Sequence, residues 1–147
     1  MSLLDSLYKE IILDHSKRPR NRGEIGDGSI RQEGLNPSCG DELELFIVVN
    51  DGVIENVKFA GEGCAISQSS ASMMTEAIKG RPITEVLERV RQFKDMIQGE
   101  PPADELGDLK LMQGVAKLHA RVKCATLAWV TLEEALAQAE QASGAAN

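Results

Sequence analysis

Apolar residues near the start of the chain recur at the three- and four-residue spacing of a helix that buries one face. The stripe consists of Leu3, Leu4, Leu7, Tyr8, Ile11 and Ile12. Ser2 and Asp5 resemble a capping box that would start this helix. The helix is predicted to end near Lys17, because Pro19 and Gly23 follow within a basic run. We interpret that basic run as a solvated helix end rather than a contact with a partner.

An alternating pattern replaces the helical spacing in the next part of the chain. Residues Gly26 to Asp41 are predicted to be loop, and a half-buried strand follows, with Leu43, Leu45, Ile47 and Val49 on one face. Asn50-Asp51-Gly52 is a strong hairpin signal. The return strand, residues 53–60, is expected to place Val53, Val57 and Phe59 on one face and Ile54, Asn56 and Lys58 on the other.

Helical periodicity returns after this hairpin. The first of these helices should run from Ala65 to Lys79, with Gly80 after it, and bury Ile66, Met73, Met74, Ala77 and Ile78. Thr84 is predicted to cap the next, whose stripe is Val86, Leu87, Val90, Phe93 and Ile97. Residues 106–115 have too weak a pattern for an assignment. The longest helix should span about 120–142 and bury Cys124, Leu127, Ala128, Leu132, Ala135, Leu136 and Ala139, with Trp129 packed beside them.

The hairpin precedes most of the helices instead of alternating with them. This order favours an α+β fold, in which helices pack on one face of a small, mostly antiparallel sheet. We expect a single domain over residues 1–142 and a flexible C-terminal tail over residues 143–147.

The net charge of the chain limits the kinds of partner that it can bind. It has 16 Lys and Arg against 23 Asp and Glu, a net charge of -7, which argues against nucleic acid as a partner. No apolar run approaches the length that crosses a membrane, and the first residues contain no signal-peptide core. The sequence therefore predicts a soluble, cytoplasmic protein.

Three cysteines, none in a CxxC spacing, suggest a metal site or a reactive thiol rather than a disulfide framework. Cys64 lies where a strand meets a helix, after Gly61 and Gly63, which allow a tight turn and a close approach. The helix N-terminus there favours a thiolate. Cys39 is displayed on a turn, and Cys124 is in the first turn of the last helix. For Cys64 alone, a buried apolar filler is the plain alternative.

Three neighbouring thiolates repel one another, so a cation is the usual resolution, and tetrahedral zinc would need a fourth ligand. Asp41 and His119 are the candidates. Asp41 is favoured, because residues two apart in an extended segment point the same way, whereas His119 and Cys124 fall on different faces of a helix. His15 is interpreted as a residue that compensates the helix dipole.

Three motifs resemble those of the IscU/NifU-type iron–sulfur cluster assembly scaffolds, with the closest match to the SufU type. They are the segments 36–41 (NPSCGD), 61–67 (GEGCAIS) and 121–129 (RVKCATLAW). This chain has Lys123 where the scaffolding relatives have a histidine, and a longer segment 81–114, as SufU-type proteins have. It departs from that type at Leu118-His119, where an aromatic residue and a proline are more usual.

The resemblance implies that Cys39, Asp41, Cys64 and Cys124 are zinc ligands. It also implies that Cys39 accepts sulfur from a cysteine desulfurase of the SufS type and that Arg121 helps to dock that enzyme. The predicted function is thus a zinc-bound sulfur-transfer intermediate, rather than an independent enzyme, which serves downstream iron–sulfur assembly or acceptor proteins. One alternative is a scaffold that holds a transient [2Fe–2S] cluster on the same residues. Another is a domain with a purely structural zinc site.

Overall fold

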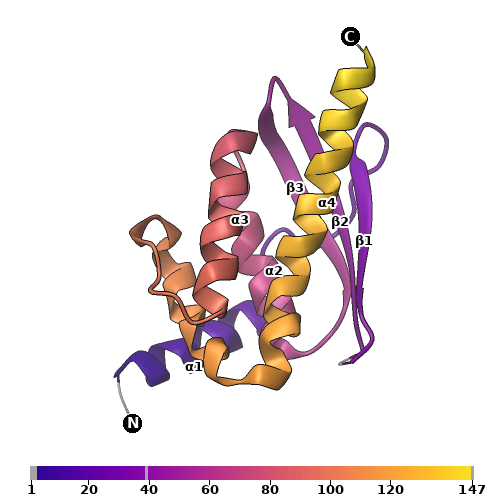
Figure 1. Ribbon diagram of the computed structural model, residues 1–147. Helices are drawn as coiled ribbons and strands as arrows, with labels where there is room; N and C mark the ends of the chain where they lie inside the picture. Colours follow the sequence, from indigo (N-terminus) through magenta and orange to yellow (C-terminus); the bar gives the residue numbers. More distant parts are fainter. Residues whose placement is uncertain (1–2, 39, 147) are drawn as a thin grey trace.

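In the computed structural model, which describes residues 3–38 and 40–146, helices cover one face of a three-stranded antiparallel sheet (Figure 1). The strands follow one another in the order β1 (Ile30–Asn36), β2 (Asp41–Asn50) and β3 (Val53–Glu62). The helical layer contains α1 (Leu3–Lys17), α2 (Ala65–Ile78), α3 (Ile83–Ile97) and α4 (Val122–Ala146), and 3-10 helices at Asp104–Lys117 and His119–Arg121. The predicted α+β class is confirmed.

Strand β1 corrects the prediction of a loop from Gly26 to Asp41. Its inward positions are Ile30, Gln32, Gly34 and Asn36, so only the first is a large apolar residue and the sequence shows no apolar alternation. Helix α4 lies directly against it, because a Cβ atom on Gly34 would be 2.0 Å from the Thr131 hydroxyl oxygen. Backbone pairing with β2 and this close helix packing therefore form a strand that periodicity does not indicate.

The predicted hairpin is confirmed, but the prediction of which residues of the return strand share its buried face is partly wrong. Asp51 and Gly52 have φ values of 54° and 74°, the left-handed pair of a tight hairpin turn. The pairing of β2 with β3 shifts between Val48 and Val49. This bulge turns Ile54 toward the interior, where it is fully buried with Val57 and Phe59, whereas Val53 is only half-buried.

The described residues of the other helices mostly follow the predicted apolar stripes, which for α1 means Tyr8, Ile11 and Ile12, since the side chains of Leu3, Leu4 and Leu7 lie outside the described part. Ser2 lies outside the described residues, and α2 has the predicted position. Helix α3 begins at Ile83 after Pro82, so Thr84 is inside the helix and is not its cap. Its buried stripe includes Met96, whereas Leu87 is exposed. Helix α4 begins at Val122 and continues to Ala146; the division into residues 1–142 and a tail of 143–147 stays a prediction.

A polar contact within the core fixes the start of α4 against α2. The Trp129 indole stacks on Phe93 with ring centroids 4.4 Å apart, and its Nε1–H donates to the Ser70 hydroxyl at 3.1 Å. Ser70 donates in turn to the Ala125 carbonyl oxygen at 2.6 Å. Trp129 is therefore a packing residue, as predicted, and Ser70 ties α2 to the helix turn that contains Cys124.

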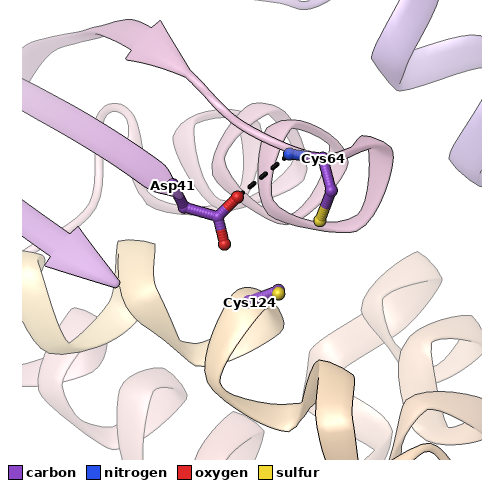
Figure 2. A group of neighbouring side chains, drawn as sticks. All are labelled: Asp41, Cys64 and Cys124. Atoms are coloured by element: carbon purple, nitrogen blue, oxygen red, sulfur yellow. Dashed lines mark hydrogen bonds between the residues drawn. The ribbon is translucent and has the colours of Figure 1, made fainter. Parts of the chain in front are cut away.

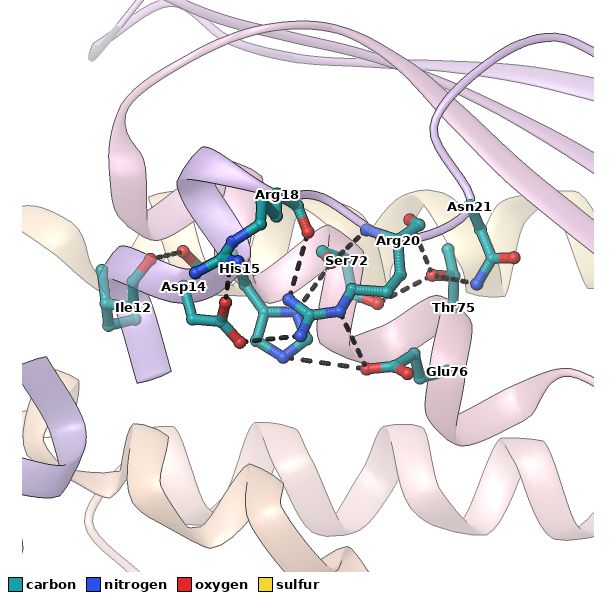
Figure 3. A network of polar contacts seen from close by, with 10 residues as sticks. Ile12, Asp14, His15, Arg18, Arg20, Asn21, Ser72, Thr75 and Glu76 are labelled. Atoms are coloured by element: carbon teal, nitrogen blue, oxygen red, sulfur yellow. Dashed lines mark hydrogen bonds and ion pairs between the residues drawn. The ribbon is translucent and has the colours of Figure 1, made fainter. Parts of the chain in front are cut away.

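A second polar contact joins α1 to α2 (Figure 3). His15 is 6% exposed, and its Nδ1 shares a hydrogen bond of 2.7 Å with Ser72 Oγ. Burial lowers the pKa of His15, and the neighbouring Arg20 guanidinium lowers it further. The interpretation of His15 as a dipole-compensating cation is therefore wrong, since its environment favours the neutral ring.

The basic run after α1 is also folded onto the protein. Arg20 donates to the Asp14 carboxylate at 2.7 Å, and Arg22 donates to the Gly61 carbonyl oxygen at 2.8 Å. The run is therefore partly folded back onto the protein, while Lys17, Arg18 and Arg22 are exposed, as expected of a solvated helix end. Within the described residues, no helix is both long and apolar enough to cross a membrane.

Candidate metal centre

Asp41, Cys64 and Cys124 meet at one end of the fold, although they are far apart in the sequence (Figure 2). One ligand atom from each lies within 4.8 Å of the others. Asp41 begins β2, Cys64 caps α2, and Cys124 is in the first turn of α4. Asp41 is 2% exposed and Cys124 is fully buried, whereas Cys64 is half-buried.

Two glycines make the approach of Cys64 to Asp41 sterically feasible. Gly61 has a φ of +123°, and a Cβ atom there would be 2.2 Å from the Glu42 carbonyl oxygen. A Cβ atom on Gly63 would be 2.3 Å from Ser67 Oγ and 2.7 Å from Asp41 Oδ1. These contacts confirm the prediction of a tight turn with a close approach in front of Cys64. The Cys64 sulfur also accepts the Ser67 N–H at 3.4 Å, so the cysteine itself caps α2.

The Asp41 carboxylate is held by neutral donors in the part of the chain that the structure describes. Its Oδ1 accepts the Cys64 backbone N–H at 3.0 Å and the Ser67 hydroxyl at 3.3 Å. Its Oδ2 accepts from Asn36 Nδ2 at 3.2 Å. A buried anion with only neutral donors is costly unless a cation compensates its charge.

Asn36 and Ser67 were not singled out from the sequence, yet both contact the predicted ligands. Asn36 Nδ2 lies 3.7 Å from Cys124 Sγ as well as within hydrogen-bond distance of Asp41. For Ser67, the available signal was its position three residues after Cys64, which is where a helix cap finds its partner. For Asn36, it was the Asn-Pro turn sequence in front of Cys39.

The donor set fits a thiophilic divalent ion such as zinc. Two sulfurs bound at about 2.3 Å in a tetrahedron lie about 3.8 Å apart, so the observed group needs only a small contraction. A buried carboxylate beside two thiols supplies negative charge that a divalent cation can balance. The group offers three ligands, and the fourth predicted ligand, Cys39, lies outside the described residues. Its flanking residues Ser38 and Gly40 are exposed, and Gly40 has a φ of +71°.

The other candidate residues, the two histidines and Arg121, lie outside the ligand group. His119 is exposed and lines a hollow of about 510 Å³ together with Ser38, Ala120, Arg121 and Lys123. Among the described residues, the ligand group contains neither His119 nor His15. Arg121 and Ser38 line the same hollow, so this predicted docking residue lies near the residue that precedes Cys39.

Tyr8 is a further neighbour of the site that the sequence did not indicate. Partial burial raises the pKa of its phenol, and the negative charge of Cys64 raises it further. Tyr8 of α1 also packs against Gly114, whose Cβ position is 3.6 Å from the tyrosine ring. Tyr8 therefore joins α1 to the 3-10 helix of residues 104–117.

The fold and the cysteine-carboxylate centre define a known class, and the sequence comparison agrees. Residues 7–141 match the model of the NifU-like N-terminal domain, and the chain belongs to this family. It is 48% identical over 139 residues to the zinc-dependent sulfurtransferase SufU of Bacillus subtilis, with 93% of this chain and 94% of that protein covered. It is 42% identical to the iron–sulfur cluster assembly scaffold protein IscU of Streptococcus pyogenes, with 97% and 90% covered.

A solved structure agrees in fold and sequence. It is that of a candidate iron–sulfur cluster assembly scaffold for the SUF system from Fervidobacterium islandicum AW-1. The two share 39% identity with a TM-score of 0.84, over 89% of this chain and 97% of that one.

Proposed function

We propose that this chain is a zinc-binding sulfur-transfer protein of iron–sulfur cluster assembly. The observation that carries the proposal is the buried convergence of Asp41, Cys64 and Cys124 in a chain similar to a zinc-dependent sulfurtransferase over almost its whole length. The chain acts as an intermediate that accepts sulfur and passes it on, working in the cytoplasm beside a cysteine desulfurase of the SufS type and downstream acceptor proteins.

The zinc ligands are Cys39, Asp41, Cys64 and Cys124. Bound zinc keeps cysteine sulfur deprotonated at neutral pH, which supplies a thiolate without a separate base. Asp41, Cys64 and Cys124 belong to the start of a strand or a helix and are fixed by backbone pairing and core packing. Cys39 follows the Asn36-Pro37 turn sequence, and loops commonly carry such chemistry. Cys39 would therefore be the cysteine whose sulfur accepts the donor sulfur, while the other three residues would hold the ion.

The transfer step exchanges one sulfur–sulfur bond for another. The Cys39 thiolate attacks the outer sulfur of the persulfide that the desulfurase forms on its own cysteine. The bond between the two donor sulfurs breaks, and its electron pair stays on the desulfurase cysteine as a thiolate. Cys39 then carries the outer sulfur, with its hydrogen, as a persulfide. No external oxidant or reductant is needed.

The basic rim beside the Cys39 loop supports a docking role for Arg121. Arg121 and Lys123 line the same hollow as Ser38, in a chain whose net charge is -7. Such a local basic surface favours binding to an acidic patch on a protein partner. The negative net charge of the chain disfavours binding to nucleic acid. Docking there would bring the donor persulfide next to Cys39.

Labelled sulfur tests the acceptor. The desulfurase, supplied with ³⁵S-cysteine, should label the peptide that contains Cys39, and Cys39→Ser should accept none while keeping part of its zinc. Ser38→Ala, one residue away, is the matched control and should be labelled like the parent. Label that appears first on the Cys64 or Cys124 peptide would overturn the assignment of Cys39.

The similarity to the Streptococcus pyogenes scaffold favours a second candidate, a site on which a [2Fe–2S] cluster is assembled. The same thiolates are suitable iron ligands. Anaerobic addition of iron and sulfide should then produce the visible absorption of a cluster, whereas a sulfur-transfer protein should stay colourless and activate the desulfurase. If neither occurs, the zinc is purely structural.

A further inference from the structure

The geometry points to Asn36 as the positioning residue of the metal centre: its side-chain amide holds the Asp41 carboxylate and the Cys124 sulfur where both can bind one ion. The inference rests on the proposed function for the identity of that ion. It adds to the site a residue that supplies no ligand atom but determines how tightly the ligands bind the ion.

The strand register places Asn36 where it can do this. Asn36 pairs with Asp41 as the last pair of the β1–β2 ladder, so its backbone lies directly beside that ligand. Asn36 is only 5% exposed, so its amide has little access to water. A buried amide without partners would be costly, and here its donors face the two ligands.

The count of donors and acceptors explains which carboxylate oxygen is left for the ion. Asp41 Oδ1 accepts from the Cys64 N–H and from the Ser67 hydroxyl. Within the described residues, Oδ2 accepts a hydrogen bond only from Asn36, at 3.2 Å. A carboxylate oxygen has two lone-pair positions, so Oδ2 keeps one for a metal. Asn36 thereby fixes the rotation of the carboxylate with Oδ2 toward the sulfurs.

The same amide reaches the second ligand. An NH₂ group has two hydrogens, and Nδ2 lies 3.7 Å from Cys124 Sγ, within the longer range of hydrogen bonds to sulfur. A hydrogen bond to a ligating thiolate adjusts its donor strength and direction. Asn36 thus contacts an oxygen ligand from one strand and a sulfur ligand from helix α4 with one nitrogen.

The chemistry of an amide suits this position. A lysine or arginine would neutralise the ligands and compete with the ion, and a carboxylate would repel Asp41. A neutral donor orients both ligands and leaves their charge for the metal. Removing such outer contacts from metal sites typically costs 10–100-fold in affinity.

The test replaces Asn36 by the similarly shaped leucine. Zinc affinity, measured by competition with a chromophoric chelator, should fall about 10–100-fold in Asn36→Leu. Gln32→Leu is the matched control, since it makes the same change on the same inward side of β1, where the glutamine contacts Glu134 and Gln138 instead. It should bind zinc like the parent.

Cobalt spectroscopy separates positioning from a general loss of stability. Co²⁺ in the parent should show thiolate-to-metal absorption and visible bands of a four-coordinate site. In Asn36→Leu these bands should shift, whereas in Gln32→Leu they should not. Should Asn36→Leu fail to fold, as judged by the melting of the metal-free protein, Asn36→Ser replaces it, since the smaller side chain also removes the amide.

A double-mutant cycle with Asp41→Ala tests the route of the effect. If Asn36 acts through Asp41, its replacement should weaken zinc binding several-fold less when Asp41 is absent. Unchanged affinity and an unchanged cobalt spectrum in a folded Asn36 variant would overturn the inference, as would full additivity with Asp41→Ala together with an unshifted sulfur band. Failure of the parent itself to bind zinc or accept sulfur would instead overturn the proposed function.

Discussion

Two polar clusters lie along helix α2, and they differ in whether the donors and acceptors within each cluster satisfy one another. In the cluster of the second half, Ser72 Oγ accepts the Arg20 N–H at 2.8 Å and shares a hydrogen bond with His15. Thr75 donates to the Ser72 carbonyl oxygen at 2.7 Å and accepts from Asn21 at 3.0 Å (Figure 3). The donors there meet acceptors, and the charged Arg20 at its edge pairs with the carboxylates of Asp14 and Glu76.

The cluster at the N-terminal end of α2 collects acceptors instead. Asp41, Cys64 and Cys124 would all bind a metal as anions, and within the described residues the hydrogen-bond donors to Asp41 are neutral (Figure 2). A buried polar cluster whose donors and acceptors satisfy one another stabilises the fold, whereas a cluster with surplus negative charge needs a cation. The two clusters should therefore respond oppositely to metal and to mutation.

Removing zinc should give the largest effect, and only at the N-terminal end of α2. A ligand present at about a thousand times its Kd stabilises the folded state by about 4 kcal/mol, so a chelator should lower the melting temperature by many degrees. Hydrogen exchange should accelerate at residues 64–67 and 122–125 and stay slow at residues 72–76. Equal acceleration at both clusters would remove the distinction between them.

Asp41→Ala should have the next largest effect. Losing a ligand should weaken zinc binding by more than the roughly 100-fold upper range for outer contacts. Chelator competition measures this. His119→Ala is the control, and it should leave zinc content and desulfurase activation almost unchanged. Metal loss that followed His119 and spared Asp41 would assign the fourth ligand to the histidine.

Ser72→Ala should affect stability without affecting metal. It removes the acceptor of the Arg20 N–H and the partner of His15, and unsatisfied buried groups cost about 1–3 kcal/mol. Urea unfolding should show this loss in both the zinc-bound and the metal-free protein, and zinc affinity should equal that of the parent. A change in zinc affinity would mean that the two clusters are coupled through α2.

The smallest effect should be a pH dependence from His15. Burial and Arg20 lower its pKa in the folded protein, against the weaker opposite effects of Glu76, Asp14 and Asp108. The unfolded chain therefore binds a proton at a higher pH than the folded one. Stability from His15 is complete above the usual histidine pKa, about 6.5, and is lost as the pH falls through the lowered folded value. His15→Gln should flatten the unfolding free energy across that window.

The sequence predicted what depends on periodicity and on local turns. The hairpin at Asn50-Asp51-Gly52 and the corner before Cys64 were recognisable because each uses local chemistry. Strand β1 was missed, since its pairing and the contact of Gly34 with Thr131 come from parts distant in sequence. The turned face at Ile54 was missed for a related reason, because a bulge shifts the register without a marked residue.

The candidate site followed the same rule. Asp41 and the cysteines were identified as ligands by residue type, spacing and family resemblance, and their assignment stays a prediction. Asn36 and Ser67 were not singled out, because an amide and a hydroxyl have many ordinary uses and only the fold shows what they contact. His15 was misinterpreted because its position at a helix end is visible in the sequence, whereas its burial against Ser72 is not.

The contact between Trp129 and Ser70 gives the molecule a built-in optical probe. Trp129 is the sole tryptophan, and through Ser70 it is linked by two hydrogen bonds to Ala125, the residue after Cys124. Any rearrangement of that helix turn when an ion or a sulfur donor engages the cysteine changes the surroundings of the indole. Stopped-flow emission of the unmodified protein can thus follow loading and release of the site in real time, with no dye attached.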